Sequence, residues 1–144
     1  MSFFSSIASL LGGSSFGPEQ FDTLRAEQPG TILLDVRSRN EYVQGHIDGS
    51  TLVPLDQLGA SLNQLAEAAA PIIVICHAGS RAATAATAIR RAGKQDVHVL
   101  AGGVSSWAGH GRKLLPGSKD LPLRDALKKA KQAAAAANAA GSEA

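Results

Sequence analysis

The sequence predicts an α/β domain with a mostly parallel central sheet of about five strands and helices on both faces. Strand-like and helix-like segments alternate along about residues 16–115, and repeated strand–helix units fold as parallel sheets. The strand-like segment over residues 31–36 is apolar nearly throughout, as expected of a strand buried on both faces. The length of 144 residues suits one such domain with its own buried core.

The first half of this domain contains two helix signals and two strand signals. A helix is expected over residues 18–27, because Pro18 and Glu19 suit a first helical turn and Pro29-Gly30 ends it. Residues 31–36 and 51–53 are expected as strands. The helix that follows should run to about residue 70, because leucines form one apolar stripe at positions 55, 58, 62 and 65.

The second half begins with the clearest strand of the chain, residues 71–75, which ends at Cys76. A helix rich in alanine is expected over residues 81–92, with Gly93 just beyond its end. Its small side chains should let it lie close against the sheet. A further strand over residues 97–100 precedes a Gly-Gly pair and a short helix that holds Trp107.

Two terminal regions differ in composition from the domain, which we place at residues 16–115. Residues 1–15 have apolar side chains at helical spacing and are expected to pack as an arm on the domain or on a second subunit. Contact with a membrane surface is the less favoured alternative, because the arm has no Lys or Arg. Residues 116–144 end in an Ala/Lys-rich stretch with almost no large apolar side chain, so we expect a frayed solvent helix or a disordered tail.

Composition excludes several classes of function. No apolar run approaches the length of about 20 residues that a membrane span needs. The single cysteine cannot form an intrachain disulfide, and it favours a reducing compartment, here the cytoplasm. Residues 1–75 carry 3 basic and 8 acidic side chains (net −5), whereas residues 76–144 carry 11 and 4 (net +7). The basic residues do not cluster with aromatic ones, so we expect no nucleic-acid partner.

The segment that carries chemistry runs from Cys76 to Arg81, between the clearest strand and the Ala-rich helix. In an open α/β sheet, ligands bind where strands end and helices begin. Backbone N–H groups of such a loop and the positive end of the following helix form an anion site. We therefore expect Cys76 to be a nucleophilic thiolate, held by a loop of His77, Ala78, Gly79, Ser80 and Arg81. The alternative is an inert buried cysteine.

The sequence gives weaker evidence for a functional role of the other polar residues. Asp35 and Arg37 end a strand on the same edge of the sheet as Cys76, so they could orient the cysteine loop or the sulfur donor. The alternative is an ion pair between Arg37 and Glu41 that only shapes the turn. His77 is interpreted mainly as loop backbone, and His46 as a structural residue bonded to backbone. The four histidines lack metal-ligand spacing, so no metal is expected.

The chain resembles the rhodanese-like sulfurtransferases over about residues 16–115. The resemblance rests on three motifs in order: Leu34-Asp35-Val36-Arg37 with Glu41-Tyr42 and Gly45-His46-Ile47-Asp48-Gly49; the Cys-x-x-Gly-x-Arg loop of Cys76, Gly79 and Arg81; and Leu100-Ala101-Gly102-Gly103 with Trp107. The chain departs from the family pattern in small ways: Ser50, Ala82 and Ala101. Ala82 removes a possible hydroxyl donor near the loop.

The resemblance implies a sulfurtransferase without a cofactor. A donor such as thiosulfate or a persulfide leaves a sulfane sulfur on Cys76, and cyanide, a thiol or a protein acceptor removes it in a ping-pong reaction. Because the chain has no second cysteine, the sulfur must leave to an external acceptor.

Three alternatives stay open. They are a persulfide carrier for a partner protein, a non-enzymatic regulatory domain, and a phosphatase. Related phosphatases place five residues between the cysteine and the arginine, whereas this loop has four, from His77 to Ser80.

Overall fold

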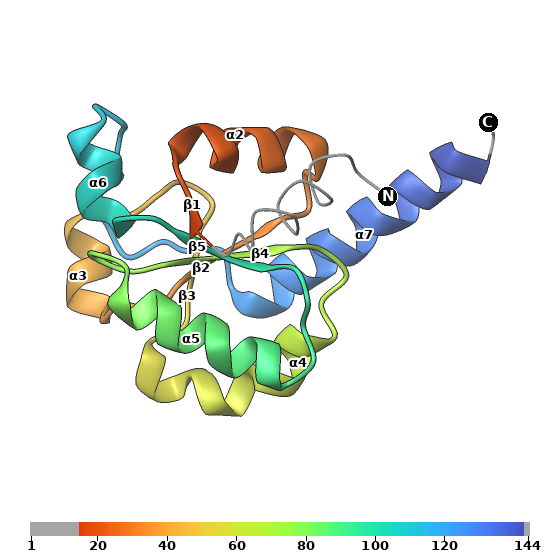
Figure 1. Ribbon diagram of the computed structural model, residues 1–144, viewed down its shortest axis with the longest axis horizontal. Coiled ribbons are helices and arrows are strands. Elements are labelled where there is room, and N and C mark those ends of the chain that lie inside the picture. Colours follow the sequence, from red (N-terminus) through yellow and green to blue (C-terminus); the bar gives the residue numbers. More distant parts are fainter. Residues whose placement is uncertain (1–14, 143–144) are drawn as a thin grey trace.

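Five short strands form one sheet in the computed structural model, which describes residues 15–142 (Figure 1). The strands are β1 Ser15–Phe16, β2 Ile32–Asp35, β3 Thr51–Leu52, β4 Ile72–Ile75 and β5 Val97–Leu100. Their order across the sheet is β1-β5-β4-β2-β3, and each neighbouring pair is parallel. The predicted α/β class with a parallel sheet of about five strands is therefore confirmed.

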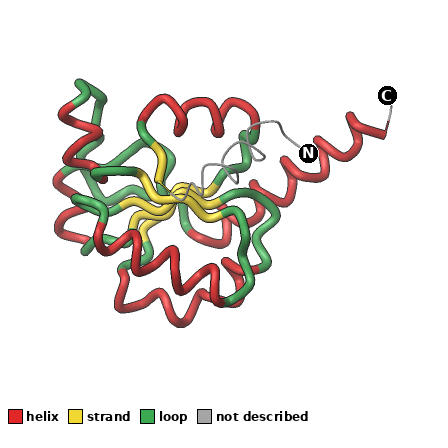
Figure 2. Tube along the Cα trace, viewed as in Figure 1, coloured by secondary structure: helices red, strands yellow, loops and turns green. Residues whose placement is uncertain are grey.

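Helices cover both faces of the sheet (Figure 2). They are α2 Pro18–Glu27, α3 Arg39–Gln44, the 3-10 helix η1 Leu55–Ser61, α4 Leu62–Ala66, α5 Ser80–Arg91, α6 Gly103–Gly109 and α7 Leu123–Ser142. In Figure 1, α2 lies on one side of the strands, and α4 and α5 lie on the other.

The alternation of side chains along each strand builds two separate cores. Leu33 and Ile73 pack on one face with Phe21 of α2 and Trp107 of α6. Residues next to them in the strands, such as Leu34, pack on the opposite face with buried side chains of η1, α4, α5 and α7. Because both faces are buried, the strands are mostly apolar, and β4 is apolar throughout; Asp35, Thr51 and His98 are buried polar exceptions.

One local prediction needs correction, and two short elements were not predicted. The helix expected from residue 55 to about residue 70 is a 3-10 helix followed by a short α-helix, Leu62–Ala66. Leu55 and Leu58 are three residues apart, which is the repeat of a 3-10 turn. Strand β1 and helix α3 were not predicted at all, although Ser38 and Glu41 form a capping box at the start of α3.

The C-terminal region also differs from the expected solvent helix or disordered tail. The first half of α7 docks on the domain, with Ala126 and Ala130 buried. Docking needs no large side chains here, because small residues allow the backbones to approach closely. A Cβ atom built on Gly30 would lie only 2.8 Å from the Cβ of Ala133.

The predicted N-terminal arm, residues 1–15, lies almost wholly outside the described residues. Among those that the structure describes, no helix combines the length and the apolar character that crossing a bilayer requires.

Candidate active site

The loop that follows β4 holds the lone cysteine at the carboxyl edge of the sheet. Cys76 is buried, with 1% of its surface exposed. The backbone N–H of Gly79 donates a hydrogen bond of 2.8 Å to its Sγ atom. Gly79 has a φ of 116°, a left-handed conformation that a residue with a side chain rarely adopts, and it caps α5. The sulfur therefore lies close to the positive end of a 12-residue helix.

Helix α6 supports this loop from the neighbouring strand connection. The N–H groups of Val104 and Ser105 donate to the carbonyl oxygens of Cys76 and His77, at 2.9 and 3.0 Å. The close approach depends on Gly103, which has a φ of 59° and whose missing Cβ would overlap the Cys76 carbonyl oxygen. The Gly-Gly pair before α6 thus fixes the backbone beside the sulfur.

Arg81 is held by a carboxylate from a distant part of the chain. Its Nη1 and Nη2 atoms donate to Oε1 and Oε2 of Glu41 at 2.7 and 2.8 Å. These hydrogen bonds lower the pKa of Glu41 from 4.5 to about 2, and they raise the pKa of Arg81. The guanidinium next to the cysteine loop is therefore oriented in advance.

The alternative pairing of Arg37 with Glu41 is wrong. Arg37 instead forms a buried ion pair with Asp35, whose Oδ2 lies 2.8 Å from the arginine Nη2. The same nitrogen donates to the carbonyl oxygen of Gly45 at 2.8 Å, so the pair ties the end of β2 to the end of α3. Arg37 reaches only the backbone carbonyl of Glu41, at 3.4 Å.

The Glu41–Arg81 pair predicts a small acid-dependent loss of stability. Because the folded-state pKa of Glu41 is about 2, below its ordinary 4.5, its contribution is present above 4.5 and is lost as the pH falls toward 2. The side chains of Arg81 and Glu41 are 37% and 34% exposed, so the contribution should stay below about 1 kcal/mol.

Urea unfolding of wild type and Glu41→Gln at pH values above and below 4.5 measures how much the Glu41–Arg81 pair stabilises the fold. The difference in free energy of unfolding should shrink as the pH falls below 4.5. A difference that stays constant would contradict the assigned pairing.

Two of the histidines, His46 and His98, are buried and stack on aromatic rings. His46 stacks on Tyr42, with 3.9 Å between ring centroids, and its Nδ1 atom lies 3.0 Å from the Tyr42 carbonyl oxygen, which confirms its structural interpretation. His98 is buried and stacks on Phe16. His77 is exposed beside the cysteine loop and contributes its carbonyl oxygen to Ser105.

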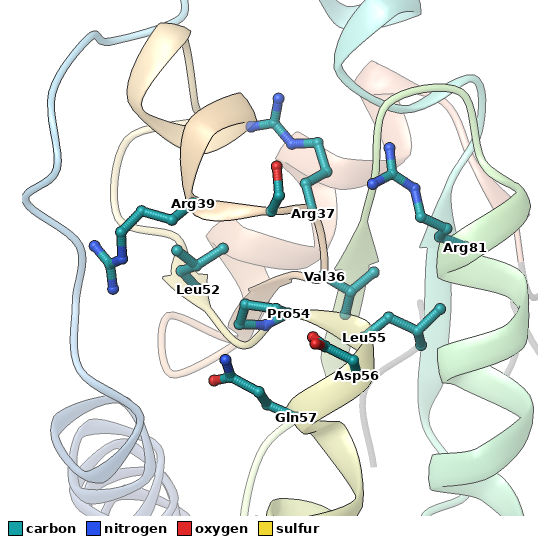
Figure 3. A pocket seen from close by; sticks show the side chains of 10 residues that line it. Val36, Arg37, Arg39, Leu52, Pro54, Leu55, Asp56, Gln57 and Arg81 are labelled. Atoms are coloured by element: carbon teal, nitrogen blue, oxygen red, sulfur yellow. The ribbon is translucent and has the colours of Figure 1, made fainter.

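Two hollows flank the cysteine loop. One, of about 630 Å³, lies over the ends of β2 and β3 and is lined by Arg81 (Figure 3). The other, of about 410 Å³, is lined by Glu41 and His77. Arg37 borders both hollows, so the two ion pairs lie between them.

Glu41 was not predicted as the partner of Arg81. The two residues are 40 positions apart, and neither helical nor strand periodicity relates them. The contact of Gly103 with the cysteine loop was not predicted either. The available signal was the position of both residues in motifs of the resembling family.

The fold and the loop define a parallel α/β domain with a single cysteine at the start of a helix, and known proteins share this arrangement. Residues 18–110 match the rhodanese-like domain family. Thiosulfate sulfurtransferase GlpE of Pseudomonas fluorescens is 33% identical over 90 residues, which are 62% of this chain and 80% of that protein. The uncharacterized protein YqhL of Bacillus subtilis is 35% identical over 88 residues, covering 61% and 69% of the two chains.

A solved structure supports the same assignment. A rhodanese-related protein from Thermoplasma volcanium has a TM-score of 0.62 and 26% identity, covering 70% of this chain and 96% of that one. The chain therefore belongs to the rhodanese-like domain family, as its motifs predicted.

Proposed function

We propose that the protein is a sulfurtransferase that carries a sulfane sulfur on Cys76. One observation supports this most directly: the Sγ atom accepts the Gly79 N–H at the start of α5, within the Cys-x-x-Gly-x-Arg loop. The donor would be thiosulfate or a persulfide, and the acceptor cyanide, a thiol or a protein. A lone cysteine also leads us to propose a cytoplasmic location.

The proposed reaction has two steps with the same nucleophile. In the first, the thiolate of Cys76 attacks the outer sulfur of thiosulfate, a new S–S bond forms, and sulfite leaves with the electron pair of the broken bond. In the second, the acceptor attacks the outer sulfur of the persulfide, and the electron pair returns to Sγ. Neither step consumes an external oxidant or reductant, and the covalent intermediate predicts ping-pong kinetics.

Each residue of the cysteine loop would have a separate role in this reaction. Gly79 supplies a backbone donor to the sulfur, and Arg81, oriented by Glu41, supplies positive charge for an anionic donor. We propose that His77, Ala78 and Ser80 act through their backbone, and that Asp35 and Arg37 hold the rim on which the loop rests.

Arg81→Ala should lower kcat/KM for thiosulfate by about 10- to 100-fold, the value of one or two charged hydrogen bonds. His77→Ala, at an exposed position of the same loop, should change it by less than about threefold. Steady-state kinetics with thiosulfate and cyanide measure both effects. Equal losses in the two variants would contradict these roles, and a failure of wild type to turn over with any donor would contradict the function.

A further inference from the structure

A hollow of about 400 Å³ lies at the amino edge of the sheet, where the parallel strands begin, opposite the cysteine loop. Three segments bound this amino-edge hollow: the turn between α2 and β2, the turn before β4, and residues 130–138 of α7. Alanine, proline and glycine form most of its lining, and among the described residues that line it only Glu27 is charged. Such a lining is complementary to an uncharged, apolar occupant.

Helix α7 forms one wall of this hollow with a face that the domain covers only in part. Ala126 and Ala130 are buried against the domain. Ala134 and Ala137 follow on the same face at helical spacing, but Ala134 is half-buried and Ala137 is exposed. Figure 1 shows the end of α7 extending beyond the sheet and its other helices. The face that docks α7 therefore continues past the part of the domain that covers it.

The chain enters the sheet from this same edge. Ser15 of β1 pairs with Val99 of the parallel strand β5, which begins at Val97, so the residues before Ser15 reach β1 from the amino edge. Strands β4 and β2, whose preceding turns line the hollow, are two and three strands away from β1. This separation is roughly 10 to 15 Å. A 14-residue segment spans about 21 Å even when it is entirely helical, so residues 1–14 are long enough to reach the hollow.

We propose that residues 1–14 form an arm that occupies the amino-edge hollow of the same molecule and covers the exposed face of α7. The segment has no Asp, Glu, Lys or Arg, and its Phe, Ile and Leu side chains are Phe3, Phe4, Ile7, Leu10 and Leu11. At helical spacing these five share one side, and Ser5 and Ser9 fall on the other. Their burial is favourable, and no charged side chain of the arm has to leave water. The inference is independent of the proposed sulfur transfer.

Leu10→Asp and Ser9→Asp place the same charge on the two sides of the arm and test whether one side is buried. Leu10→Asp should raise the equilibrium constant for unfolding in urea about 5- to 30-fold, because an apolar contact is lost and a charge faces the hollow. Ser9→Asp is the matched control and should change this constant by about twofold or less. Equal unfolding constants for the two variants would overturn the proposal.

A second pair of variants tests whether the buried side of the arm contacts the hollow. Ala134→Glu places a charged side chain in the hollow, and Ala135→Glu places the same side chain at an exposed position of α7. The further effect of Leu10→Asp should shrink to about twofold or less in Ala134→Glu, and it should keep its full size in Ala135→Glu. An undiminished effect in Ala134→Glu would place the arm elsewhere and overturn the proposal.

A spin label on Ser9→Cys, in a Cys76→Ser background, locates the arm in the folded protein. It should broaden the amide NMR signals of Gly30 and Ala134 at the hollow far more than that of Arg39 at the opposite edge of the sheet. Equal broadening at the two edges, or none at either, would contradict the assigned position.

Mixed samples show which molecule supplies the arm. Isotope-enriched protein that carries the spin label is diluted with unlabelled protein, and isotope-enriched protein without a spin label is mixed with spin-labelled protein of natural isotope content. Broadening at the hollow is expected in the first sample and not in the second. Broadening in the second sample alone would show that a second copy supplies the arm, and the proposal would be wrong.

Discussion

Replacing Cys76 by serine is expected to lower turnover with thiosulfate and cyanide by a factor on the order of 10³ or more. The hydroxyl group of serine is a weak nucleophile toward sulfur and cannot hold a persulfide. The loop should otherwise persist, because its backbone is fixed by the N–H groups of Val104 and Ser105 rather than by the sulfur. Steady-state rates with thiosulfate measure the effect.

The free energy of urea unfolding controls for a loss of fold in this variant. Cys76 is buried, so a small change in stability is expected, but the variant should unfold cooperatively. Appreciable turnover in a folded Cys76→Ser protein would show that the sulfur passes through another group, and the mechanism proposed above would be wrong.

Gly103→Ala is expected to have the largest effect on stability, a loss of about 3 kcal/mol. The new methyl group would overlap the carbonyl oxygen of Cys76, and the φ of 59° is itself unfavourable for alanine. The backbone must shift at the cysteine loop, so activity should fall together with stability. Urea unfolding and thiosulfate turnover measure the two consequences.

Gly109→Ala is the matched control in the same helix. A Cβ atom at Gly109 meets no atom within 4 Å, so the substitution should be neutral or stabilise α6 by about 0.5 kcal/mol through better helix propensity. If the two alanine variants were equally stable, the tight contact between α6 and the loop would not exist in solution.

The sheet and its helices were largely predictable, because burial on both faces leaves a strong signal in the sequence. Residues 71–75 are almost entirely apolar, and β4 was predicted to within one residue. The long helix α5 was predicted to within one residue at each end, because Gly93 marks its C-terminal side. Such signals are local, and the tertiary structure agrees with them.

Short elements and small-residue contacts were harder to predict. Helix α3 has only six residues, and its one signal was the capping box of Ser38 and Glu41. The docking of α7 depends on how closely Ala130 can approach the turn at Gly30, which no hydrophobic pattern expresses. Both elements depend on packing between segments that are far apart in the chain.

The candidate site also has parts that the sequence predicted and parts that it did not. The loop from Cys76 to Arg81 could be found from its place between a strand and a helix. The orientation of Arg81 by Glu41 could not, because the pairing depends on how α3 and α5 meet in space. The hollow over the ends of β2 and β3 likewise exists only once these two strands lie side by side.

Uptake of a sulfane sulfur by Cys76 is tested most directly by the mass of the intact protein after incubation with thiosulfate. Wild type is expected to gain one sulfur atom that cyanide removes, and Cys76→Ala is expected to gain none. An unchanged mass with both thiosulfate and a persulfide donor, or an equal gain in Cys76→Ala, would contradict it.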